Sequence, residues 1–273
     1  MTSGSALATP LSPWQRLRQR LGPLVRAVIP SRLPLKGPYP SYAAALAEAT
    51  GYDSPLVPQL VEEATRAVLE GRAAYERDGT AFATRPTLPI HGALRPWISA
   101  RATIADFGGG LGGLYLNAPE LFPPGCRQIV IEQASMVEAG RRLARHHRLA
   151  VEFMEARREA IPAVDVLIFS CVLQYLADPW ATVETLLRQT TPAVVILDRT
   201  AIRHGPSRWY LQTNPGYYRE PVTYPVQVLN QRRLLEAFPG YRPVRRWHNA
   251  FDPSRPKHIG MLLRKDAAPG AAG

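Results

Sequence analysis

The feature that most constrains the fold is a run of glycines, because five of the six residues from Gly108 to Gly113 are glycine. The run directly follows the apolar segment 103–107 and precedes a segment of helical pattern. Glycine adopts positive φ and lets the backbone pass close to a ligand. The N-terminus of a following helix adds free N–H groups and a positive dipole end. The segment therefore predicts a strand, a ligand-binding turn and a helix.

Strand and helix patterns alternate through the rest of this region. The expected strands are residues 103–107, 128–132, 151–154, 164–170 and 193–198, and the expected helices between them are residues 113–121, 136–147 and 179–189. This alternation predicts a doubly wound, Rossmann-like α/β fold with a mostly parallel sheet. Residues 230–238 predict one more helix. Residues 241–248 and 259–264 predict a C-terminal antiparallel strand pair.

Two regions are expected ahead of the sheet. Residues 1–35 form a basic extension with an amphipathic helix, which either contacts an anionic membrane surface peripherally or docks on the protein's own core. Residues 36–100 predict a helical cap, in which Ser41 caps a helix through Ala49 and a longer helix covers residues 58–76.

The remaining organisation follows from composition. Residues 101–265 are the expected ligand-binding domain, and its insertion 199–225 is rich in tyrosine and arginine, as suits the wall of an active site. Residues 266–273 are small and polar, and we expect them to be disordered.

Charge and cysteine usage limit the partners. The net charge of +11 attracts anions, but no basic motif interleaved with aromatic residues favours a specific nucleic acid. Cys126 and Cys171 form no C-x-x-C pair and the histidines are scattered, so neither a disulfide framework nor a metal site is expected. No apolar run approaches the roughly 20 residues of a membrane span, and no secretory leader is recognisable. A cytoplasmic location is therefore expected.

Two motifs overlap in the glycine run. Asp106, Gly108, Gly110 and Gly112 give D-x-G-x-G-x-G, which resembles the first motif of class I methyltransferases that use S-adenosylmethionine (SAM). Gly108, Gly110 and Gly113 give G-x-G-x-x-G, the dinucleotide fingerprint. Spacing alone leaves both open. Asp106, a carboxylate two residues before the first glycine, favours the methyltransferase motif, because it suits the amino group of SAM and would repel a pyrophosphate.

Glu132 ends the second expected strand, where a carboxylate can accept both hydroxyls of a ribose. Enzymes that bind NAD use the same device, so Glu132 supports a nucleoside without saying which one.

The segment from Asp165 to Pro179, DVLIFSCVLQYLADP, resembles the fourth-strand motif of class I methyltransferases. Together with the glycine run and Glu132, the resemblance covers about residues 100–264. More narrowly, the segments GPYPSY (37–42), GYD (51–53), DFGGG (106–110), LQYL (173–176), LDRT (197–200) and YP (224–225) are similar to those of a poorly characterised bacterial methyltransferase family. Its members are often associated with surface-polysaccharide genes.

The resemblance implies SAM as the cofactor. The methionine end would lie against Asp106 and the glycine turn, the ribose on Glu132, the adenine after the third strand and the sulfonium over the end of the fourth. The implied cofactor-binding residues are Asp106, Phe107, Gly108, Gly109, Gly110, Gly112, Glu132, Gln133, Glu155, Ala156, Ser170, Cys171 and Val172.

The acceptor side is less defined. Gln174 stands where many relatives have histidine, so the candidate general bases are histidines after the fifth strand, namely His204, His248 and His258. Arg199 can pair with a carboxylate or phosphate of a substrate. The expected substrate-binding residues are Gln174, Tyr175, Arg199, Tyr217 and Tyr218.

These residues together predict SAM-dependent methyl transfer to an oxygen or nitrogen of a small-molecule or glycan-related acceptor. Two alternatives stay open: an NAD-linked oxidoreductase or epimerase, and a non-catalytic binding protein with the methyltransferase fold. The sequence does not predict an oligomeric state.

Overall fold

The computed structural model of the chain describes residues 35–50, 56–156, 158–214, 222–248 and 257–267. The amphipathic helix expected near the N-terminus, Tyr217, Tyr218 and the tail from residue 268 onward lie outside these ranges.

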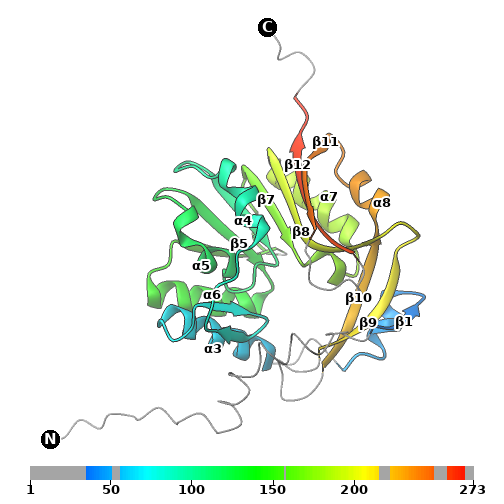
Figure 1. Cartoon of the computed structure of the whole chain (residues 1–273), viewed down its shortest axis with the longest axis horizontal. Helices are drawn as coiled ribbons and strands as arrows, with labels where there is room; N and C mark the ends of the chain where they lie inside the picture. Colours follow the sequence, from blue (N-terminus) through cyan, green and yellow to red (C-terminus); the bar gives the residue numbers. More distant parts are fainter. Residues whose placement is uncertain (1–34, 51–55, 157, 215–221, 249–256, 268–273) are drawn as a thin grey trace, which may run out of the picture. The chain divides into compact units, whose positions relative to one another are not determined.

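Five parallel strands form the centre of the sheet (Figure 1), in the order β6-β5-β4-β7-β8. The strands are β4 (Thr103–Phe107), β5 (Arg127–Glu132), β6 (Val151–Glu155), β7 (Val166–Ser170) and β8 (Val194–Arg203). The chain starts in the middle at β4, moves outward to β6, and then crosses back to β7 on the other side of β4. The predicted doubly wound, mostly parallel sheet is therefore confirmed.

The C-terminal strands complete this sheet. Strand β12 (Lys257–Lys265) runs antiparallel to β8, and β11 (Tyr241–His248) runs antiparallel to β12. The predicted antiparallel pair is thus confirmed. The two strands cover the edge of β8 that faces away from β7.

Helices cover both faces of the sheet. Helices α7 (Pro179–Thr190) and α8 (Gln231–Glu236) pack on one face, and α4 (Pro89–Leu94), α5 (Gly113–Asn117) and α6 (Ala134–His147) on the other. Because both faces are buried, the strands are continuous apolar runs instead of alternating ones. Val166 to Phe169 of β7 are all fully buried.

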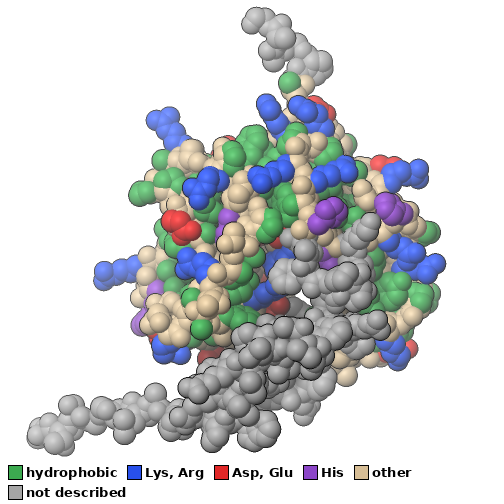
Figure 2. All heavy atoms as spheres, viewed as in Figure 1, with side chains coloured by type: hydrophobic (Ala, Val, Ile, Leu, Met, Phe, Trp, Pro, Cys, Tyr) green, Lys and Arg blue, Asp and Glu red, His purple; other side chains and the backbone are tan. Residues whose placement is uncertain are grey.

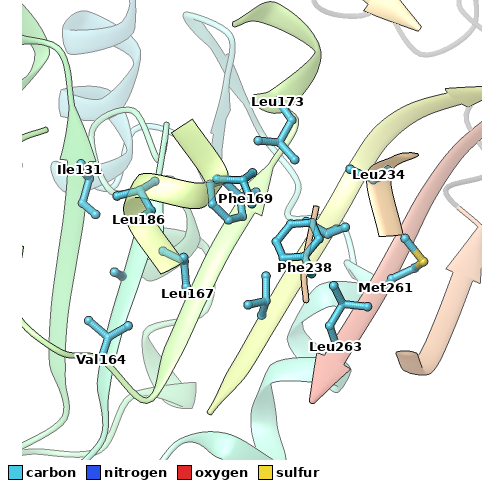
Figure 3. Packing of buried hydrophobic residues seen from close by; sticks show 14 of the residues in the cluster. Ile131, Val164, Leu167, Phe169, Leu173, Leu186, Leu234, Phe238, Met261 and Leu263 are labelled. Carbon is cyan, nitrogen blue, oxygen red and sulfur yellow. The ribbon is translucent and has the colours of Figure 1, made fainter. Parts of the chain in front are cut away.

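Alternate residues of β7 enter different clusters. Leu167 and Phe169 belong to the cluster under α7 and α8, whereas Val166 and Ile168 belong to the cluster under α4. Figure 3 shows the first cluster, in which the ring of Phe169 lies 6.3 Å from that of Phe238. These two faces define where the side chains at the strand ends point.

The segment 36–100 differs from the expected helical cap, because it contains strands as well as helices. Helix α2 (Tyr42–Leu46) begins after Ser41, whose Oγ accepts from the backbone N–H of Ala44 at 3.1 Å, so this cap is confirmed. Helix α3 (Leu56–Leu69) ends seven residues earlier than expected, since Gly71 adopts positive φ and a hairpin follows.

The hairpin consists of β2 (Tyr75–Arg77) and β3 (Thr80–Phe82). Its turn residues, Asp78 and Gly79, have φ values of 52° and 73°. Asp-Gly with two positive φ angles is the typical two-residue hairpin turn. The Asp78-Gly79 turn therefore fixes a hairpin here, although the helical pattern in the sequence extends to residue 76.

The insertion after the fifth parallel strand is also β-structure where it is described. Strand β9 (Arg208–Asn214) pairs antiparallel with β10 (Val222–Asn230), and β1 (Leu35–Tyr39) pairs antiparallel with β9. At its end, β10 runs parallel to β8 beyond the point where β7 stops. The helix expected from residue 230 begins at Gln231, with Asn230 as its N-cap.

Basic side chains are spread over the visible face of the molecule and are separated by apolar and neutral ones (Figure 2). Among the residues that the structure describes, no helix is long and apolar enough to cross a membrane.

Two helical glycines allow a test of this packing. A Cβ on Gly140 of α6 would lie 2.4 Å from Phe153 of β6, whereas one on Gly92 of α4 would meet nothing nearer than 3.8 Å. We expect Gly140→Ala to lower the free energy of unfolding by about 1–3 kcal/mol through overpacking. Gly92→Ala should leave it unchanged or raise it by up to about 1 kcal/mol. Urea unfolding measures both, and equal effects would contradict the packing of α6 on β6.

Candidate functional site

The carboxyl ends of the parallel strands bring polar side chains to one edge of the sheet. Glu132 of β5 lies opposite Glu155 of β6, and Ser170 of β7 lies opposite Asp198 of β8. Asp106 comes from β4, the strand at which the order of the sheet reverses. In open α/β sheets, ligands bind at this edge and at this switch point.

The glycine turn packs tightly against the protein on two sides. A Cβ on Gly108, whose φ is 74°, would lie 2.5 Å from Val172, and one on Gly109 would lie 2.6 Å from Oδ2 of Asp106. Gly110 differs, since its φ is also positive but the nearest atom to its Cβ position is 4.0 Å away, in Met136. As far as the described residues go, the turn is therefore closed toward Asp106 and Val172 and open at Gly110.

Asp106 is buried, and within the described residues its Oδ1 atom has no hydrogen-bond partner. Burial raises the pKa of Asp106 to about 7, although the nearby charge of Arg199 acts in the opposite direction. An unpaired buried carboxylate oxygen is costly, and a donor from a ligand would remove that cost.

Glu132 is held in place by the backbone on both sides. Its Oε1 accepts from the N–H of Gly110 at 3.1 Å, and its Oε2 accepts from the N–H of Gln133 at 3.0 Å. Burial raises the pKa of Glu132, and these two backbone donors lower it. Each oxygen keeps a second lone pair, so the carboxylate can still accept from a ligand.

The other expected nucleoside-side residues border these two. Phe107 packs against Phe169, with ring centroids 5.7 Å apart and the ring planes tilted by 56°. Glu155 ends β6, where its backbone N–H donates to Glu159 at 2.8 Å, and Ala156 packs against the core beside it.

Asp198 organises the ends of β7 and β8. Ser170 Oγ donates to its Oδ2 at 3.1 Å, and Trp247 Nε1 of β11 donates to its Oδ1 at 2.9 Å. Arg199 Nε lies 3.3 Å from the same Oδ2, and Arg199 Nη2 donates to Ser170 Oγ at 3.0 Å. The carboxylate is 4% exposed and thus satisfied by three different strands.

A bulge in β8 makes this arrangement possible. Leu197 pairs with Met261 of β12 and Thr200 pairs with Ile259, so Asp198 and Arg199 together oppose the single residue Gly260. Arg199 has a φ of 49°. Such a bulge turns a side chain away from the face that strict alternation would give it. Arg199 thereby reaches the same side of the sheet as Asp198.

The bulge also changes which face of the sheet the later residues of β8 point to. Ile196 enters the cluster under α4, whereas Ile202, which is also an even-numbered residue, enters the cluster under α7 and α8. Gly260 is needed opposite the bulge, since a Cβ there would lie 1.9 Å from the indole of Trp247.

The residues after β7 form a wall next to this cluster. Cys171 has a φ of 56°, and the fully buried Gln174 donates to its Sγ at 3.3 Å and to the carbonyl of Arg199 at 3.1 Å. Tyr175 lies edge to face with Tyr224 of β10, with centroids 5.5 Å apart. Gln174 and Tyr175, both expected at the acceptor side, thus lie between the ends of β8 and β10.

The hairpin β2–β3 lies beside the glycine turn, which the sequence did not predict. Glu76 Oε1 accepts from the N–H of Gly79 at 2.9 Å, and its Oε2 lies 3.9 Å from the Cβ position of Gly113. Burial raises the pKa of Glu76 to about 7. Burial also raises the pKa of Tyr75, and the charge of Arg199 opposes this. The hairpin is therefore within electrostatic reach of Arg199.

The three candidate bases lie farther along the strands. His204 follows β8 and His248 ends β11, and both are exposed. His258 of β12 is half-buried and pairs with Ala201, three residues beyond Asp198. Their roles stay predictions, and Tyr217 and Tyr218 lie outside the described residues.

Asp198, Trp247 and the hairpin are the residues that the sequence analysis missed. Asp198 had a signal, since it follows an apolar run in the sequence just as Asp106 does. Trp247 had none, because only the fold brings it from β11. Within the described ranges, no three histidine, cysteine, aspartate or glutamate side chains come together as metal ligands would.

Neither a protein-family model nor a curated protein sequence matches this chain. Solved structures do. The N-terminal domain of EvdMO1 with SAH bound is 14% identical, covers 77% of this chain and 96% of that chain, and gives a TM-score of 0.45. A SAM-dependent methyltransferase from Methanosarcina mazei is 14% identical, with 67% and 99% covered and a TM-score of 0.49. The glycopeptide N-methyltransferase MtfA complexed with SAM is 15% identical, with 60% and 87% covered and a TM-score of 0.44. Each of these three structures is similar to this chain in fold. The assignment of the candidate site rests on the residues of this chain.

The buried carboxyl of Asp106 gives the first prediction for the site. Because its pKa is raised from 3.8 to about 7, its ionisation opposes folding, and this penalty grows between pH 4 and 7. We expect Asp106→Asn to raise the free energy of unfolding above pH 7, by on the order of 2 kcal/mol, and to have little effect near pH 4.

Urea unfolding across this pH range is the measurement. Glu152→Gln is the control, because Arg127 lowers the pKa of Glu152 and the sign is reversed. That variant should lose a small amount of stability at neutral pH. An Asp106→Asn variant that is less stable than the wild type at pH 8 would show that Asp106 has a partner in the folded chain.

Proposed function

We propose that the chain is a SAM-dependent methyltransferase that acts on an oxygen or nitrogen of a small-molecule acceptor. The observation that carries the proposal is the buried Oδ1 of Asp106, which has no hydrogen-bond partner in the described part of the chain and lies beside a glycine turn at the switch point of the sheet. A carboxylate in this position suits a ligand that brings an ammonium group.

The neighbouring residues fit the rest of such a cofactor. Glu132 presents a carboxylate whose orientation is fixed by two backbone N–H groups, as recognition of a ribose requires. The open side of Gly110 leaves space where a side chain would otherwise project. Asp106, Glu132 and the glycine turn would therefore hold the methionine part and the ribose.

When bound, SAM supplies an electrophilic methyl group on its sulfonium. The chain's part is to align an acceptor with that group, since orientation provides much of the acceleration in a displacement of this kind. Ser170 and Cys171 end the strand beside β4, and Gln174 and Tyr175 follow them. These residues would position the acceptor and exclude water.

The narrower features of the acceptor also belong to this proposal. Tyr175 and Tyr224 give the wall an aromatic surface, and Gln212 donates to the hydroxyl of Tyr224 at 2.8 Å. Aromatic rings next to amides suit a polar ring such as a sugar, so a glycan-related acceptor is the form that we favour. A cytoplasmic location and peripheral membrane contact by the N-terminal extension stay predictions.

Calorimetric titration with SAM, SAH and NAD tests the cofactor. We expect micromolar binding of SAM or SAH, no binding of NAD, and loss of binding in Asp106→Ala. Binding of NAD alone would favour an oxidoreductase. A chain that binds none of the three would be a binding protein that has kept only the fold.

Alanine substitutions at two glycines can distinguish the loss of space for a ligand from the cost of positive φ for a non-glycine residue. Gly110 and Gly71 both have positive φ, and no atom of the described residues lies nearer than 4.0 Å to the Cβ position of either glycine. Alanine at either position should cost about 1–2 kcal/mol of stability. Only Gly110→Ala should weaken SAH binding, by about tenfold or more. Equal affinities in the two variants would remove the glycine turn from the site.

A further inference from the structure

The strand ends carry charges of opposite sign on one face of the sheet. Ile104 of β4, Ile168 of β7 and Ile196 of β8 all enter the cluster under α4. Two residues farther along each strand, Asp106, Ser170 and Asp198 therefore point to this same face. The bulge adds Arg199 to it. The glycine turn thus shares this face with Arg199 and with Asp106, whose Oδ1 has no hydrogen-bond partner among the residues that the structure describes.

Arg199 is held in a fixed position. Its Nε pairs with Asp198 and its Nη2 donates to Ser170, and neither of these contacts involves Nη1. The side chain is 23% exposed. An anchored, partly exposed guanidinium of this kind is suited to bind a carboxylate.

Asp106 lies across β7 from Arg199. Strands β4 and β8 flank β7, so their backbones are about 10 Å apart. The charge of Arg199 acts on Asp106, yet in the described part of the chain Arg199 pairs with Asp198 and Oδ1 of Asp106 has no hydrogen-bond partner. The side chains of Asp106 and Arg199 thus come from strands on either side of β7, where they can bind the two ends of one small group that carries both charges.

We propose that Asp106 and Arg199 together form a site for an α-amino acid head group, with Asp106 accepting from the ammonium and Arg199 Nη1 donating to the carboxylate. This inference rests on the proposed function, because the head group is that of SAM. It gives Arg199 a role toward the cofactor in place of the role toward the acceptor that its position in the sequence suggested.

Charge balance favours this ligand over an anionic acceptor. Arg199 stands between the carboxylates of Asp198 and Asp106, so a phosphate brought to it would meet two negative groups. An amino acid head group brings its own ammonium for Asp106 and adds no net charge to the site.

The test compares three nucleosides by calorimetric titration. These are SAM, decarboxylated SAM, which lacks only the carboxylate, and 5′-methylthioadenosine, which lacks the whole amino acid part. The wild type should bind SAM about 10- to 100-fold more tightly than decarboxylated SAM. Arg199→Met should remove this preference by weakening SAM alone. Arg199→Lys should keep part of the preference, because it keeps the charge without the planar fork.

Two further variants sharpen the comparison. Asp106→Asn should weaken SAM and decarboxylated SAM alike and leave methylthioadenosine unchanged. Arg127→Met removes an arginine at the start of β5, where it pairs with Glu152, and should leave all three affinities unchanged. Thermal unfolding without ligand shows whether the Arg199→Met variant is folded. If that variant is unfolded, the Arg199→Lys variant is used for the comparison instead.

Several outcomes would overturn the inference. If Arg199→Met keeps the preference for SAM over decarboxylated SAM, Arg199 does not bind the carboxylate. If it weakens all three nucleosides equally, its role is structural. A wild type that binds SAM and methylthioadenosine equally has a nucleoside site without a head-group site. A wild type that binds none of the three contradicts the proposed function itself.

Discussion

The buried carboxylate of Asp198 is the constraint on which this edge of the sheet depends. A charge with 4% exposure persists only if it is paired and hydrogen-bonded. Its partners come from the end of β7, from the bulge in β8 and from β11, so three strands must be in register for the carboxylate to be satisfied. The same contacts fix Arg199 and Ser170. Stability and the geometry of the site are thus maintained by one network.

The central sheet could be predicted from sequence because its signals are local. Each parallel strand is a continuous apolar run, and the glycine turn after β4 has a strong backbone requirement of its own. Asp106 and Glu132 were expected from carboxylates near strand ends, whereas Ser170 and Gln174 came from the resemblance to class I methyltransferase motifs. These residues do lie at one edge of the sheet.

The parts that could not be predicted depend on contacts distant in sequence. Trp247 reaches Asp198 only because β11 and β12 pair with β8, and nothing near residue 247 indicates this partner. The hairpin β2–β3 was not predicted: the helix expected over residues 58–76 extended into its first two residues, Tyr75 and Glu76, and the pairing of β2 with β3 depends on the Asp78-Gly79 turn. The acceptor wall likewise depends on β10, which lies fifty residues from Tyr175 in the chain.

The bulge at Asp198 and Arg199 has a consequence for how this protein can vary. Because side chains alternate along a strand, the extra residue moves the side chain of every later position in β8 to the opposite face of the sheet. Ile202 shows this, since it lies in the cluster under α7 and α8 whereas Ile196 lies in the cluster under α4. Loss of a single residue here would restore regular alternation and bring Ile202 to the opposite face. Length in this strand is therefore under tighter restraint than residue identity. Chains that tolerate many substitutions around this strand should still keep its residue count, together with the glycine that faces the bulge.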